Sequence, residues 1–132
     1  PPGLTWGYEN RTTCFRLVGH DAGSLRVENR LPGADTNPYL TTAATLAAGI
    51  AGILNKIEPE PEVVGSGYSQ EPARDFARSM PEAIKRLRGS DFARDWLGPR
   101  FVDGFTSTRE SQHDEFRRKV PDVELQRFFD LG

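Results

Sequence analysis

The sequence contains a single cysteine, Cys14, so no disulfide can form within the chain. Such sparse cysteine use agrees with a reducing, cytoplasmic location. Histidine is also scarce: His20 lies in a turn and His113 in a charged segment, and neither has a partner at the spacing of a zinc site. We therefore expect no conventional zinc centre, and we expect Cys14 to be a packed side chain.

Long apolar runs and an excess of one charge are absent as well. The longest apolar stretch, residues 40–54, is interrupted by threonines and is too short to span a bilayer. Lysine and arginine number 17 against 19 aspartates and glutamates, a net charge of −2. This balance gives no general attraction to nucleic acid or to an anionic membrane, so neither is expected as a partner. Any anion-binding role must come from a local cluster of arginines.

The chain start shows no targeting segment. Its first residues, PPGLTWGYEN, lack the basic start and the apolar run of a signal peptide, and they lack an initiator methionine. The sequence leaves open whether the chain is a natural short protein or a piece of a longer one.

Two stretches predict an antiparallel hairpin over residues 11–31. Residues 11–18 are rich in β-branched and aromatic types, and residues 24–31 alternate apolar and polar side chains around a compact turn signal, GHDAG. If Val18 faces Ser24, then Arg16 faces Arg26, Cys14 faces Glu28 and Thr12 faces Arg30, all on one side of the hairpin. Arg11 has the opposite parity to Arg16, so it fits only from before the strand or from a bulge.

Helices are expected after the hairpin. Asn37 is a good N-cap and Pro38 suits a first helical position, which predicts a long helix over residues 38–56. Its many alanines and glycines indicate a backbone packed closely against a sheet. A loop is expected over residues 57–78 and further helices over residues 79–131, the last of them over residues 123–131. This order predicts an α+β fold in which the hairpin is packed by C-terminal helices, with residues 1–132 as a single portion.

The charged strand carries the functional interpretation. Arg26, Glu28 and Arg30 cover about 13 Å of one strand face. A solvated outer face with weak ion pairs is one reading. The alternative starts from the excess of arginines over Glu28, which repel one another unless an anion joins them. Arginine suits phosphate and carboxylate, and a lone glutamate can hold a divalent ion.

Three ordered motifs resemble a known family. NRTTCFRLVG, RVENRLPGADTNPYL and AATLAAGIAGI are similar to the C-terminal catalytic part of glutamine synthetase and its γ-glutamyl-amine ligase relatives. The closing VELQRFFDLG resembles the final helix of that family. PGAD stands where ordinary glutamine synthetases have Pro-Asp-Pro, which favours the enzymes that join glutamate to amines or polyamines.

The resemblance implies roles for five residues. Arg11 corresponds to a catalytic arginine near the transferred γ-phosphate and the substrate carboxylate, and Arg16 and Arg26 correspond to ATP-phosphate ligands. Glu28 corresponds to a ligand of Mg²⁺ or Mn²⁺, and Arg30 to the arginine that pairs with substrate glutamate. The implied reaction uses ATP to phosphorylate the side-chain carboxylate of L-glutamate, after which ammonia or an amine displaces phosphate.

The resemblance also implies what a complete enzyme adds. The N-terminal β-grasp domain of the family and its other metal-binding residues are not recognised in these residues, so the chain alone is expected to be inactive. Its expected partners are that N-terminal part and, in the full-length protein, further copies in a homo-oligomer. The alternative is a non-catalytic, stand-alone binding or regulatory module derived from such a ligase.

Overall fold

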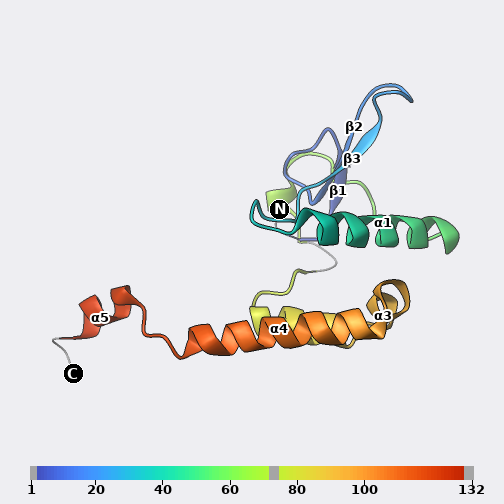
Figure 1. The fold of residues 1–132 in the computed structure, drawn as a ribbon. Helices are drawn as coiled ribbons and strands as arrows, with labels where there is room; N and C mark the ends of the chain where they lie inside the picture. Colours follow the sequence, from blue (N-terminus) through green and yellow to red (C-terminus); the bar gives the residue numbers. More distant parts are fainter. Residues whose placement is uncertain (1–2, 72–74, 130–132) are drawn as a thin grey trace. The chain divides into compact units, whose positions relative to one another are not determined.

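The computed structural model describes residues 3–71 and 75–129 (Figure 1). Its elements confirm the α+β class, with a small mixed sheet and several helices. In chain order they are β1 (Trp6–Tyr8), β2 (Phe15–Val18), β3 (Arg26–Asn29), α1 (Pro38–Leu54), the 3-10 turn η1 (Gly67–Ser69), α2 (Met80–Arg88), α3 (Asp91–Leu97), α4 (Pro99–Arg117) and α5 (Asp122–Phe128). The chain divides into two compact units, unit 1 (Pro1–Phe76) and unit 2 (Ala77–Gly132), which are described separately.

The sheet of unit 1 has the order β1-β2-β3. β2 and β3 are antiparallel, as the hairpin pattern predicts, but the register is shifted: Val18 lies opposite Arg26, and Arg16 lies opposite Glu28. The shift arises because the connection takes up residues 19–25, where the Asp21 carboxylate accepts hydrogen bonds from the backbone N–H groups of Gly23 and Ser24, both at 2.9 Å. Because positions 24 and 26 have the same parity, the face that carries the charges is unchanged.

The start of the sheet differs more from the prediction. β1 runs parallel to β2, with Trp6 opposite Phe15. Residues 9–14 form the connection between these strands, so Thr12 and Cys14 are not strand partners of Arg30 and Glu28. Cys14 is fully buried, and its carbonyl oxygen accepts a hydrogen bond from the backbone N–H of Arg30 at 2.9 Å.

The segment after α1 covers the outer edge of β1. The backbone N–H of Val63 donates to the carbonyl of Trp6 at 3.0 Å, and the Glu62 carboxylate accepts from the backbone N–H of Tyr8 at 2.7 Å. The Trp6 indole donates to the carbonyl of Glu60 at 2.5 Å. Residues 60–63 thus serve as an irregular edge partner of the sheet, within a stretch predicted as a surface loop; residues 72–74 of that stretch lie outside the described residues.

Helix α1 begins as the sequence predicts. The Asn37 side chain accepts hydrogen bonds from the backbone N–H groups of Tyr39 and Leu40, at 3.0 and 3.2 Å. The helix ends at Leu54 and lies beside the sheet in Figure 1. Close packing of its glycines is not observed, since a Cβ atom at Gly49 or Gly52 would meet nothing within 4 Å. Contact with the rest of the unit is concentrated on other positions, including the buried Ala47 and Ala51 and a 3.0 Å hydrogen bond from Asn29 to Thr45.

In unit 2, the short helices α2 and α3 pack on α4. Ser79 and Ser90 accept backbone hydrogen bonds at the starts of α2 and α3, as expected of N-caps. The buried side chains among its described residues are Ile84, Ala93, Val102 and Thr106. α5 ends at Phe128 and is exposed throughout; positions 130–131 of the predicted last helix lie outside the described residues. None of the helices in the described ranges is long and apolar enough to cross a membrane.

Candidate functional site

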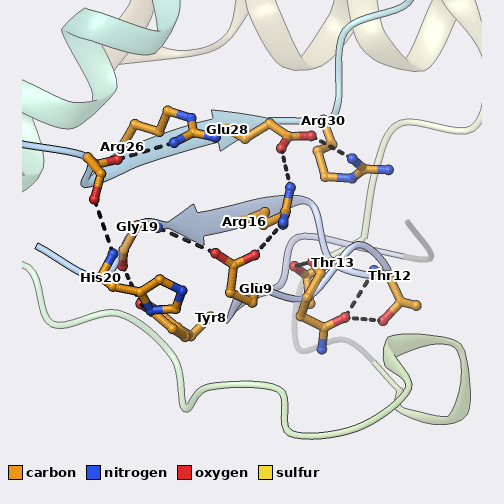
Figure 2. A network of polar contacts seen from close by, with 12 residues as sticks. Tyr8, Glu9, Thr12, Thr13, Arg16, Gly19, His20, Arg26, Glu28 and Arg30 are labelled. Carbon is orange, nitrogen blue, oxygen red and sulfur yellow. Dashed lines mark hydrogen bonds and ion pairs between the residues drawn. The ribbon is translucent and has the colours of Figure 1, made fainter.

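Arg16, in the middle of β2, is the centre of a charged cluster (Figure 2). Its side chain is 13% exposed and lies between two carboxylates. One terminal nitrogen, Nη1, donates to Oε2 of Glu28 at 3.0 Å, and the other, Nη2, donates to Oε2 of Glu9. The strand register explains the first contact because Arg16 and Glu28 are directly opposite each other on neighbouring strands.

Glu28 joins a second arginine to the cluster. Its Oε1 accepts a hydrogen bond from Nη1 of Arg30 at 2.5 Å. The result is a continuous row of alternating charges, Glu9–Arg16–Glu28–Arg30, which contains two carboxylates and two guanidiniums. The strand pattern indicated an excess of positive charge because it did not include Glu9. With Glu9 present, the two carboxylates of the row balance its two guanidiniums.

Glu9 is the residue that sequence reasoning missed. It directly follows β1, and its backbone N–H donates to the carbonyl of Leu17 at 2.9 Å. Its φ of 50° places it in the left-handed region, which is uncommon for a residue other than glycine. Its sequence neighbourhood gave no usable signal, because β1, the strand before it, has only three residues.

The other predicted site residues lie apart from this row. Arg26 is on the same strand face as Glu28, but it is exposed, and its Nη1 donates to the backbone carbonyl of Ser24 at 3.2 Å. Arg11 lies in the connection between β1 and β2, before the strand proper. Its side chain is exposed and makes no hydrogen bond or ion pair with the residues that the structure describes. The structure thus brings together Arg16, Glu28 and Arg30, but not Arg11 or Arg26.

The connection that carries Arg11 is held by Asn10. The amide nitrogen of Asn10 donates to the carbonyls of Val63 and Gly65, at 3.0 and 2.8 Å. Its amide oxygen accepts from both the backbone N–H and the hydroxyl of Thr12, at 3.0 and 2.6 Å. That hydroxyl in turn accepts from the backbone N–H of Gly67 at 2.7 Å. Within the Asn-Arg motif, Asn10 therefore has a structural role, since it fixes the loop that carries Arg11.

Both carboxylates of the cluster are held in their ionised form. The hydrogen bond from Arg16 lowers the pKa of Glu9 below its ordinary value of 4.5. Arg30, and then Arg16, lower the pKa of Glu28 in the same way. Glu9, and then Glu28, raise the pKa of Arg16. Glu9, Arg16 and Glu28 are therefore all charged at neutral pH.

Unit 1 is expected to lose stability in acid through these two glutamates. A carboxylate with a lowered native pKa contributes stability above its unfolded pKa, and that contribution disappears as the pH falls through the native value. The loss should therefore begin near pH 4.5, the ordinary value of both groups, and increase below it. Urea unfolding between pH 7 and pH 3, followed by Trp6 fluorescence in a Trp96→Phe background, measures unit 1 specifically.

The control for this measurement is the double variant Glu9→Gln/Glu28→Gln. It should show a flatter dependence of unfolding free energy on pH, and the part that remains includes Asp21, whose pKa is lowered by hydrogen bonds from Ser24. An unchanged pH dependence in the double variant would contradict the assignment.

A divalent metal ion does not fit this cluster by itself. Over the described ranges, no group of three or more histidine, cysteine, aspartate or glutamate side chains is arranged to hold a metal ion. Glu28, the carboxylate implied as a ligand by the resemblance, is already paired with two arginines. Any metal bound at Glu28 would need ligands from beyond the described residues.

Comparisons with known proteins agree with these motifs. Residues 1–128 match the family described as glutamine synthetase, catalytic domain. A glutamate–isopropylamine ligase from a Pseudomonas species is 38% identical over 129 residues, which cover 96% of this chain and 28% of that protein. A γ-glutamylethanolamide synthetase from Streptomyces coelicolor is 40% identical over 134 residues, covering 98% of this chain and 28% of that protein.

A glutamine synthetase of different origin gives a similar match. Type-1 glutamine synthetase 2 from Dictyostelium discoideum is 34% identical over 135 residues, covering 99% of this chain and 26% of that protein. The chain thus spans just over a quarter of the length of these curated relatives. Because the family match extends over residues 1–128 and includes the strands, the charged cluster and the helices described above, the chain belongs to the glutamine synthetase family.

Proposed function

We propose that the chain forms part of the active site of an ATP-dependent ligase that joins ammonia or an amine to the γ-carboxylate of L-glutamate. The observation that carries the proposal is the row Glu9–Arg16–Glu28–Arg30 on the sheet of a glutamine synthetase family member. An active site that moves a phosphoryl group needs cationic groups held in place, since catalysis of this transfer is mostly positioning and charge stabilisation. The paired, partly buried Arg16 meets that need.

The roles proposed for single residues follow the family resemblance. Arg16 and Arg26 bind ATP phosphates, Arg11 lies near the transferred phosphoryl group and the substrate carboxylate, and Arg30 binds the carboxylate of glutamate. Glu28 is one ligand of Mg²⁺ or Mn²⁺, whose remaining ligands come from elsewhere in the longer enzyme. When bound, that metal ion would neutralise charge on the phosphate oxygens.

The acceptor is proposed to be an amine rather than ammonia. Two of the relatives described above are named for joining glutamate to isopropylamine and for making γ-glutamylethanolamide, and a γ-glutamylputrescine synthetase of Escherichia coli is 32% identical over 126 residues. The PGAD sequence at residues 32–35 agrees with this choice. The 132-residue chain alone is expected to show no turnover, since no metal-binding group is complete within its described residues.

Calorimetry with Mg-ATP tests the nucleotide site. We expect Arg16→Ala to weaken Mg-ATP binding about ten-fold or more, the change expected when one charge-assisted contact to phosphate is lost. Arg100→Ala is the matched control, because Arg100 is an exposed arginine in unit 2 that belongs to no predicted site. Equal affinities for wild type and Arg16→Ala would remove Arg16 from the site, and no heat with either protein would remove the nucleotide site from this chain.

A further inference from the structure

We infer that Glu9 is the positioning residue for Arg16: it holds the guanidinium in place for a phosphate-bearing ligand independently of Glu28. This inference rests on the proposed function, in which Arg16 contacts the phosphates of ATP. It adds a residue that the sequence motifs do not point to, and the role assigned to that residue is to hold Arg16.

The two carboxylates that contact Arg16 are not equivalent. Glu28 divides its oxygens between two arginines, Oε2 to Arg16 and Oε1 to Arg30. Among the described residues, Glu9 forms an ion pair with Arg16, and its other oxygen, Oε1, accepts from the backbone N–H of Gly19 at 3.4 Å. Of the two, Glu9 makes the larger contribution to the raised pKa of Arg16. A ligand or ion that drew Glu28 away would therefore leave Arg16 with one full ion pair.

The orientation of Arg16 depends on these two contacts. Its Nε is buried and has no hydrogen-bond acceptor among the described residues. The Nη1 and Nη2 contacts are thus the hydrogen bonds by which the described residues fix the plane of the guanidinium. Losing the Glu9 contact would leave Arg16 tied to Glu28 by a single nitrogen, about which the group can turn.

Glu9 is itself held by the surrounding backbone. Its φ of 50° is maintained by the 2.9 Å hydrogen bond from its N–H to Leu17. Gly19, which donates to the carboxylate, is fixed in turn because the Tyr8 hydroxyl donates to its carbonyl oxygen. Uncommon backbone conformations of this kind persist where the surrounding structure imposes them, and they concentrate at functional sites. Figure 2 shows Tyr8, Glu9 and Gly19 on the side of Arg16 away from Glu28.

The test compares two charge-removing variants that keep side-chain shape. In Glu9→Gln, an amide oxygen remains to accept from Gly19, so the loop is retained while the ion pair to Arg16 is lost. Side-chain NMR of ¹⁵N,¹³C-labelled arginine measures how fast the Nη groups of Arg16 rotate. We expect Glu9→Gln to increase that rate about ten-fold, as loss of a charge-assisted hydrogen bond implies, and Glu28→Gln to change it less.

A binding measurement separates positioning from a merely structural role. We expect Glu9→Gln to weaken Mg-ATP binding about ten-fold when affinity is measured well below its melting temperature, and Glu9→Asp, which keeps the charge, to recover part of the loss. Glu62→Gln is the matched control, since Glu62 contacts the backbone of Tyr8 and not Arg16. Unchanged rotation of Arg16 in Glu9→Gln, or wild-type affinity despite faster rotation, would overturn the inference.

Failure of the proposed function gives a different result. If Mg-ATP produces no heat with the wild-type chain, the nucleotide site is lost before any Glu9 variant is compared, and the inference falls with it. If wild type binds and Arg16→Ala does not, the site stands, and the Glu9 variants alone decide whether the inference is correct.

Discussion

Replacing Asn10 by alanine is expected to destabilise unit 1 by about 3 kcal/mol, at about 1 kcal/mol for each of several hydrogen bonds lost. The side chain joins two carbonyls of a distant segment, Val63 and Gly65, to the backbone and hydroxyl of Thr12. Alanine would leave these groups, most of them partly buried, without their Asn10 partner. Urea unfolding followed by Trp6 fluorescence in a Trp96→Phe background gives the free energy of unfolding.

Two variants test whether the loss of the Asn10 hydrogen bonds causes the fall in the free energy of unfolding. Asn10→Asp keeps the acceptor for Thr12 but replaces the donor to Val63 and Gly65 with a negative oxygen, so it should not rescue stability at neutral pH. Asn55→Ala removes an asparagine of the same unit with one hydrogen bond, 2.8 Å from its Nδ2 to the carbonyl of Ala51. Its cost should be about 1 kcal/mol. An Asn10→Ala protein as stable as Asn55→Ala would contradict the assignment.

Gly19→Ala is expected to lower the free energy of unfolding of unit 1 by at least about 2 kcal/mol, within the range of a strained backbone position. The φ of Gly19 is 119°, a conformation that L side chains rarely adopt. A Cβ atom there would lie 2.5 Å from the backbone carbonyl group of Ser24 and 2.7 Å from Cα of Leu25. Since these neighbours are backbone atoms, the whole connection between β2 and β3 would have to move.

The matched control is a glycine of the same unit with open space around it. A Cβ atom at Gly49, within α1, would meet nothing within 4 Å. Gly49→Ala is therefore expected to leave stability unchanged or to raise it by up to about 1 kcal/mol through helix propensity. Equal effects of the two substitutions would show that the conformation of Gly19 is not what the connection requires.

Local signals predicted the parts of the fold that depend on local chemistry. Asn37 was recognised as a helix start because an N-cap side chain bonds to backbone groups two or three residues away. Strand alternation placed Arg16, Arg26 and Glu28 on one face, and this survived an incorrect register because a shift by an even number of residues preserves the face. These predictions needed no knowledge of distant contacts.

Non-local contacts explain what was missed. β1 is too short to show a periodic pattern, and it is defined by pairing with β2 and by contacts to residues 60–63. Asn10 is fixed by carbonyls more than fifty positions away, at residues 63 and 65. Glu9 reaches Arg16 because β1 and β2 lie side by side, an arrangement that an antiparallel reading of residues 11–31 does not contain. The family resemblance supplied roles for residues, but not these contacts.

The contacts of residues 60–63 with β1 also help to prevent this small sheet from pairing with the sheets of other molecules. Open strand edges recruit strands from neighbouring chains, which leads to aggregation. At the β1 edge, residues 62–63 already occupy the backbone of Trp6 and Tyr8, so an incoming strand must first displace them. At the β3 edge, the alternating Arg26 and Glu28 would have to match charges on any added strand. The charged side chains of β3 therefore also limit unwanted strand pairing at that edge.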